Sequence, residues 1–161
     1  MLPLGMMAQD NSAFMKFFQQ CSGKDGYTTI NLSSELLSVM TLMADEQDER
    51  DLISSIDAIR IVVCHHPGDE EFEKGIKKLL RDPDYYQLVS SINENGKNVI
   101  NLYQVCRDNK IVEFMMVATG PEPEGNCVLN ITGNIQLDRL SALSELVLPP
   151  LDTLSIQTPQ P

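Results

Sequence analysis

Residues 98–118 read NVINLYQVCRDNKIVEFMMVA, and this stretch decides the fold of the chain. Apolar and polar residues alternate with a period of two before Asp108-Asn109, and an apolar run follows that pair. Asp and Asn tolerate the left-handed backbone conformation that a tight hairpin turn needs. We therefore predict a strand over residues 98–107, a turn at Asp108-Asn109 and an antiparallel strand over residues 111–118.

Two further strands flank this hairpin. Residues 85–92 have strand character, and Asn95-Gly96 after them is a strong hairpin signal. A loop with two prolines spans residues 120–125 and leads into a strand over residues 127–132. The second half of the chain is therefore predicted to form a four-strand meander.

The first half of the chain alternates between helical and strand periodicity. Helix N-caps are predicted at Asp10 or Ser12, at Ser33 and at Asp69. A short acidic helix is predicted to turn Leu52, Ile53 and Ile56 inward. The remaining predicted elements are helices over 14–21, 33–43, 69–81 and, after the meander, 137–147, with strands over 27–32 and 58–64.

This order predicts an α+β fold. We expect a two-layer sandwich with a mixed or mostly antiparallel sheet, a C-terminal four-strand meander and helices mainly on one face. A single domain is expected over residues 11–147. Asn101 and Tyr103 share one strand face with Val99 and Val105, so we expect a partly solvent-exposed sheet surface there.

The two ends of the chain lie outside the predicted domain. Residues 1–10 are mostly apolar and uncharged before Asp10, and we interpret them as the remnant of a secretory signal peptide. They contain no basic residue, so an ordinary apolar arm stays open as the alternative. No cysteine follows directly, which leaves lipid attachment unsupported. Residues 148–161 are rich in Pro, Ser, Thr and Gln and are predicted to form a flexible tail.

Composition narrows the class of partner. The chain has 161 residues and a formal net charge of −11, and its pI is near 4.4. A field of this sign repels a phosphate backbone, so we do not expect a nucleic acid partner. No stretch approaches the roughly 18 apolar residues of a transmembrane helix, so no transmembrane segment is predicted.

The four cysteines are Cys21, Cys64, Cys106 and Cys127. An even number in an exported protein permits two disulfides. In the predicted meander, however, Cys106 and Cys127 lie about 20 Å apart along the sheet, at roughly 3.3 Å per residue. A disulfide does not reach that far. We therefore predict that these two are not bonded to each other, and that most of the four are free and buried.

Cys64-His65-His66 is the one cluster of metal-ligand residue types in the sequence. Neighbouring side chains of a strand point to opposite faces, so Cys64 and His66 are the pair able to share a metal. A zinc site needs three or four protein ligands, and no second Cys/His pair is near in sequence. We therefore expect no metal and no other cofactor. If the protein does bind a metal, Cys64 and His66 are the candidate ligands. Motifs for nucleophilic catalysis, zinc proteases and nucleotide binding are missing from the sequence.

Five stretches resemble a known family of domains of unknown function, small exported proteins of Bacteroidetes-type bacteria. These stretches are YTTINLSSELL (27–37), IDAIRIVV (56–63), DYYQLV (84–89), KIVEFMMV (110–117) and LNITGNIQLDRLSAL (129–143). The resemblance covers roughly residues 12–147 and implies export and a compact α+β fold. It implies no established activity and no functional residues. It does not extend to those members that carry a lipid-attachment cysteine.

The leading hypothesis is a non-enzymatic exported domain of the periplasm or cell envelope. It would bind a protein or a small ligand, for instance in envelope signalling or stress sensing. The alternative is a metal or redox protein, or an enzyme, that uses Cys64 and His66. A purely structural envelope protein is a third hypothesis, and a homodimer stays open.

Overall fold

The computed structural model describes residues 12–92, 98–121 and 125–136. Within these residues the chain forms four helices and one six-stranded sheet. The helices are α2 (Ala13–Cys21), α3 (Ser34–Met43), α4 (Gln47–Ser54) and α5 (Glu70–Leu79). The strands are β1 (Tyr27–Leu32), β2 (Ile56–Cys64), β3 (Tyr86–Ile92), β4 (Val99–Arg107), β5 (Lys110–Thr119) and β6 (Cys127–Ile135).

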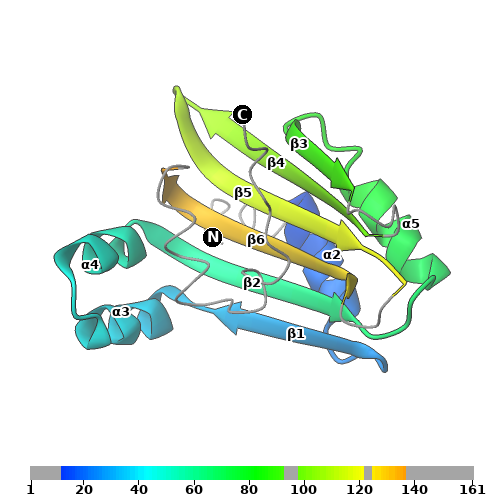
Figure 1. Ribbon diagram of the computed structural model, residues 1–161, viewed down its shortest axis with the longest axis horizontal. Helices are drawn as coiled ribbons and strands as arrows, with labels where there is room; N and C mark the ends of the chain where they lie inside the picture. Colours follow the sequence, from blue (N-terminus) through cyan, green and yellow to red (C-terminus); the bar gives the residue numbers. More distant parts are fainter. Residues whose placement is uncertain (1–11, 93–97, 122–124, 137–161) are drawn as a thin grey trace, which may run out of the picture.

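The sheet is antiparallel throughout, with strand order β1-β2-β6-β5-β4-β3. Strand β2 lies beside β1, and the chain then crosses through α5 to the far edge of the sheet (Figure 1). From there β3, β4, β5 and β6 return as a meander until β6 pairs with β2. The predicted α+β class and the C-terminal meander are therefore confirmed.

Local sequence signals explain where these elements begin and end. Asp108 and Asn109 have φ angles of 53° and 63°, as the tight turn between β4 and β5 requires. The side chains of Ser12, Ser33 and Asp69 each accept a hydrogen bond from a backbone N–H in the first turn of the following helix. Of the two predicted caps for the first helix, Ser12 is the one used.

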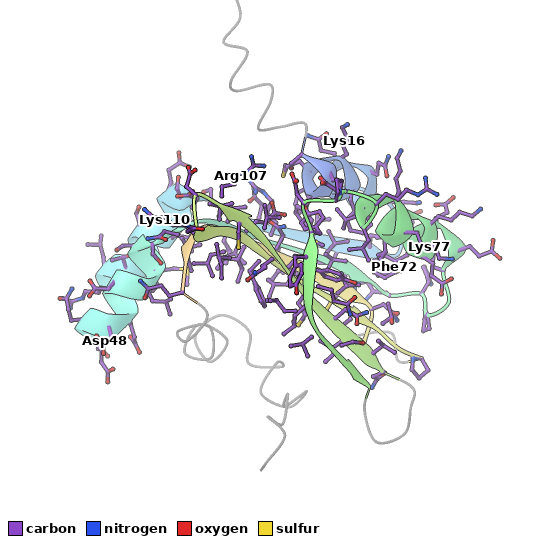
Figure 2. The ribbon with its side chains drawn as sticks, turned by 90° about the horizontal axis from the view of Figure 1, so that it is seen from above. Lys16, Asp48, Phe72, Lys77, Arg107 and Lys110 are labelled. Carbon is purple, nitrogen blue, oxygen red and sulfur yellow. The ribbon has the colours of Figure 1, made fainter. Side chains whose placement is uncertain are left out.

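The first face of the sheet is covered by α2 and α5. These helices bury Phe14, Phe17 and Phe72 against apolar side chains of the central strands, and they lie together on one side of the sheet in Figure 2. The expected partly exposed surface is found at Val99 and Asn101, which are half-buried, but not at Tyr103, which belongs to the cluster that these helices cover. Tyr103 is only 8% exposed.

The second face carries a separate apolar cluster. Helices α3 and α4 leave the sheet after β1 and return to it at β2, forming an arm at one end of the sheet (Figure 1). We call residues 33–55 the α3–α4 arm. Leu37, Leu52 and Ile53 of this arm pack in one cluster with side chains of β2, β5 and β6.

One sequence-based prediction differs from the structure, and several others concern residues that the structure does not describe. Ile56 was expected in the acidic helix, but that helix ends at Ser54 and Ile56 opens β2. It is still buried, because β2 enters the core at that residue. The signal-peptide interpretation of 1–10, the turn at Asn95-Gly96, the helix over 137–147 and the tail over 148–161 all lie outside the described residues.

Candidate functional site

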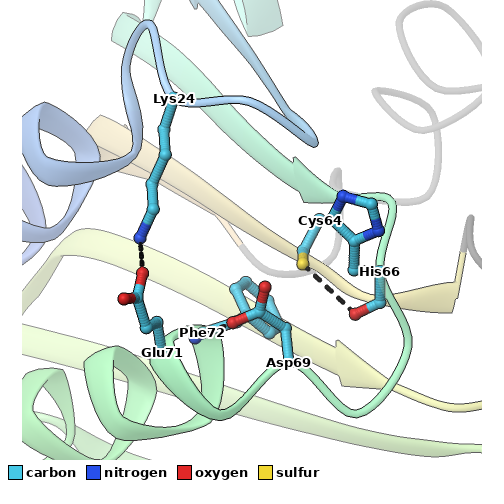
Figure 3. Close-up of polar contacts among 6 residues, drawn as sticks. All are labelled: Lys24, Cys64, His66, Asp69, Glu71 and Phe72. Carbon is cyan, nitrogen blue, oxygen red and sulfur yellow. Dashed lines mark hydrogen bonds and ion pairs between the residues drawn. The ribbon is translucent and has the colours of Figure 1, made fainter.

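Cys64 and His66 lie where β2 ends, but their side chains do not meet. The contact between the two residues is made by the Cys64 thiol and the backbone carbonyl of His66. Cys64 is fully buried, and its Sγ donates a hydrogen bond to the carbonyl oxygen of His66 at 3.5 Å (Figure 3). The ion pair between Lys24 and Glu71 lies across from this contact and links the loop after α2 to α5. The thiol therefore contacts a peptide oxygen of His66.

Each imidazole ring has its own neighbour. The Nε2 of His65 lies 2.8 Å from the hydroxyl of Thr28. The ring of His66 lies against Gly26, where an added Cβ would come within 2.2 Å of it. Within the described ranges, no group of three or more His, Cys, Asp or Glu side chains could hold a metal ion.

All four cysteines are free thiols. Cys106 pairs with Ile111 near one end of β5, and Cys127 pairs with Ala118 near the other end of that strand. The predicted absence of a Cys106–Cys127 bond therefore holds. Burial was expected for most of the four, but only Cys21 and Cys64 are buried, whereas Cys106 is exposed.

The environment of two thiols makes them poor nucleophiles. Burial raises the pKa of Cys21 from 9.0 to about 11 and raises that of Cys127 to about 11 as well. Because the thiolate is the reactive form, both groups stay protonated and inert at neutral pH.

A polar network under α2 is a feature that sequence reasoning missed. The hydroxyl of Tyr85 donates to Oε2 of Glu113 at 2.5 Å, and the side-chain amide of Asn130 donates to the same oxygen at 2.7 Å. Asn130 is 1% exposed. Burial and the nearby Glu113 carboxylate raise the pKa of Tyr85 above its usual value. No local motif marks this network, because its members come from three different segments.

Among the described residues, the two most exposed of the large apolar side chains lie on α3. Leu42 and Met43 are 84% and 77% exposed, and Leu36 and Val39 on the same side of the helix are 45% and 52% exposed. Only Leu37 of this helix is buried. The helix therefore has two apolar sides, one packed on the domain and one directed outward.

Charge is distributed unequally over the molecule. Residues 33–54, which cover most of the arm, contain six acidic residues and only one basic residue, Arg50. Lys16, Lys78 and Arg81 instead line a groove between α2 and α5. Figure 2 shows the two regions at different ends, with Asp48 on α4 and with Lys16 and Lys77 near the groove. The exposed apolar side of α3 therefore lies in an acidic environment.

These features define a class: a small α+β domain with an antiparallel sheet and an outward-facing apolar helix. Among the helices that the structure describes, none has the length and apolar character needed to span a membrane. The chain belongs to the family described as Domain of unknown function (DUF4252), whose model matches residues 18–143. The resemblance to a family of domains of unknown function is thus confirmed, whereas the bacterial source and the export that it implies stay predictions. A comparison with curated proteins and one with solved structures gave no match.

Proposed function

We propose that this protein is an exported, non-enzymatic module that binds another protein through the outer side of α3. The observation that carries the proposal is the exposure of Leu42 and Met43, 84% and 77%, in the last turn of that helix. Single exposed apolar residues are common on protein surfaces, but a contiguous apolar patch marks an interaction site.

The arrangement along α3 supports a continuous binding surface. Leu36, Val39 and Met43 recur at helical spacing, so they form one stripe, which Leu42 widens. Ile30 of β1, a strand that α3 contacts, is also 40% exposed. A partner helix laid along this stripe would bury all of these side chains together.

The acidic side chains near the stripe favour a partner with basic residues. Acidic side chains at Glu35, Asp45, Glu46 and Asp48 are exposed around the stripe. The complementary partner is an amphipathic segment with an apolar stripe flanked by Lys or Arg. Its charges would accelerate association and set its orientation, while the apolar contact would supply most of the affinity.

The export part of the proposal depends on the mostly apolar, uncharged character of residues 1–9. In that location, a small domain with an outward binding helix suits a role in envelope signalling. Fractionation of the tagged full chain in its host tests this part separately. Recovery in the cytoplasmic fraction alone would contradict export without affecting the binding surface.

Two designed peptides of equal length test the binding surface. Both repeat the same leucine pattern on one side of a helix, and the other side carries lysine in one peptide and glutamate in the other. Fluorescence anisotropy with the full chain should show binding of the leucine–lysine peptide only. Added salt should weaken that binding, because it screens the charges.

Matched variants separate apolar docking from simple charge attraction. The double variant Leu42→Ser/Met43→Ser keeps the net charge and should weaken binding about tenfold or more, since each buried side chain of this kind contributes about 1.5–3 kcal/mol. The control is Val89→Ser on the far edge strand β3, where Val89 is 45% exposed. Equal binding by the double variant and the wild type would refute the proposed surface.

A further inference from the structure

The groove between α2 and α5 has the size of a small-molecule site. Its volume is about 360 Å³, and ligand pockets in proteins occupy about 300–1,000 Å³. Side chains of both helices and of the turn after α5 line it. Figure 2 shows α2 and α5 side by side, with Lys16 on α2 and Lys77 on α5. The groove is therefore large enough for a compact ligand.

The base of the groove is apolar. Phe17 and Leu79 line it and are only 4% and 1% exposed. Helix α5 comes close to Phe17 at Gly75, where an added Cβ would lie 2.9 Å from the aromatic ring. A glycine inside a helix costs about 1 kcal/mol relative to alanine, and here the missing side chain lets the ring reach α5. A ligand in the groove therefore meets an aromatic ring and a leucine.

Basic side chains from both helices surround this apolar base. Lys16 belongs to α2, Lys78 to the last turn of α5 and Arg81 to the turn that follows, and all three are exposed. Lys16 and Gln20 are four residues apart, and Lys78 and Arg81 are three apart, so each pair lies on one side of its own helix. Within the part of the chain that the structure describes, the two ion pairs leave these three basic groups unengaged.

The local charge of the groove is opposite to that of the whole chain. One carboxylate, that of Asp82, also lines the groove, and its Oδ1 accepts a hydrogen bond from the backbone N–H of Asp84 in the turn. A positive charge at the C-terminal end of α5 offsets the helix dipole, which accounts for Lys78. It does not account for Lys16, which lies inside α2 and lines the same groove. Three basic groups and one carboxylate favour an anion.

We propose that this groove binds a small phosphate monoester with an apolar body. At neutral pH such a group carries a charge of about −1.5 to −2 and three acceptor oxygens, which matches the three basic side chains. Arginine holds a phosphate through two parallel hydrogen bonds, and lysine contributes a point charge. The apolar body of the ligand lies on Phe17 and Leu79.

The net charge of −11 does not prevent this binding. Exposed charges more than about 8 Å apart are largely screened at physiological ionic strength. The acidic α3–α4 arm lies at the other end of the molecule (Figure 2). The basic groups of the groove therefore dominate at the short distances of a bound ligand, and added salt should weaken its binding.

NMR titration of the isotope-labelled full chain with phenyl phosphate tests the proposal. The backbone amide signals of α2 and α5 along the groove should shift, whereas those of α3 should not. Inorganic phosphate lacks the ring and benzyl alcohol lacks the charge, so each should bind about tenfold more weakly or less. No shift along the groove with phenyl phosphate would refute the site.

Two further probes define the class of anion. Methyl phenyl phosphate is a diester, like a phospholipid headgroup, and benzoate carries a carboxylate. Both have the same ring and a single negative charge, so both should bind more weakly than phenyl phosphate. Equal binding of the diester would assign the groove to lipid headgroups, and equal binding of benzoate would assign it to carboxylates. Either result would overturn the monoester.

Matched lysine variants locate the site. Lys16→Gln/Lys78→Gln removes two charges from the groove and should weaken binding of phenyl phosphate about tenfold or more. The control Lys74→Gln/Lys77→Gln removes the same two charges from α5 outside the groove and should change binding little. All four lysines are exposed, so both variants should fold. Equal losses in the two variants would mean general charge attraction and would refute the site. Neither measurement depends on the α3 surface, so the proposed function can fail without affecting this inference.

Discussion

Replacing Gly133 with alanine should destabilise the protein strongly, because two costs add at this residue. Gly133 has a φ of +145°, and an added Cβ would lie 2.4 Å from the carbonyl oxygen of Ser55. It would also lie 2.9 Å from the backbone of Ile56 and Asp57. These neighbours are backbone atoms, so no side-chain rotation relieves the clash. Gly133 holds the end of α4 against β6, where Asn134 donates a backbone hydrogen bond to Ser55.

The magnitude follows from the two costs. An unfavourable backbone conformation costs about 1–3 kcal/mol, and forced overpacking costs about 1–3 kcal/mol more. We therefore expect the free energy of unfolding to fall by about 2–6 kcal/mol, a large share of the roughly 5–15 kcal/mol of a typical domain. Urea denaturation followed by circular dichroism measures this change.

Gly68→Ala is the matched control. Gly68 also has a positive φ, +73°, but an added Cβ there would have nothing within 4 Å. This variant should carry only the backbone cost of about 1–2 kcal/mol. If Gly133→Ala destabilises the protein no more than Gly68→Ala does, the close approach of β6 to the end of α4 is wrong.

Three further predictions follow from buried groups. Tyr85→Phe removes the hydrogen-bond donor to Glu113 and should lower the free energy of unfolding by about 1.5–3 kcal/mol. The control Tyr86→Phe, at a residue 67% exposed, should change it little. Equal urea midpoints of the two variants would contradict the network. In the native protein a thiol reagent should modify Cys106 quickly and should reach Cys21 and Cys64 only on unfolding; rapid labelling of all four would contradict their burial. Burial raises the pKa of Cys21 to about 11, so the unfolded chain loses this proton first, and stability should fall as pH rises from about 9 to 11, by at most about 2–3 kcal/mol. Cys21→Ala should make that decline less steep, as measured by urea unfolding at each pH.

Most of the fold could be predicted because its signals are local. The turn at Asp108-Asn109, the caps at Ser33 and Asp69 and the alternation in β4 each depend on residues close in sequence. The burial of Tyr103 on β4 was not predicted, because a mixed polar and apolar face does not reveal which side the helices cover. The covered side is set by where α5 packs after the chain leaves β2, and α5 lies in the same apolar cluster as Tyr103.

The candidate surfaces were harder to predict for the same reason. Met43 lies at helical spacing from Leu36 and Met40, as a buried residue would, yet it is exposed together with Leu42 because of how the arm leaves the sheet. The network of Tyr85, Glu113 and Asn130 needs the register of β5 against β6. Sequence spacing carries neither piece of information.

The strand order has a consequence for how the chain reaches its native state. Strand β2 pairs on one side with β1, its near neighbour in sequence, and on the other with β6, the last strand. Until β6 emerges, the β1–β2 pair and the β3–β5 meander are two separate sheets with open edges. Pairings between such distant residues slow folding, so the sheet is completed only when the last and the second of these strands meet.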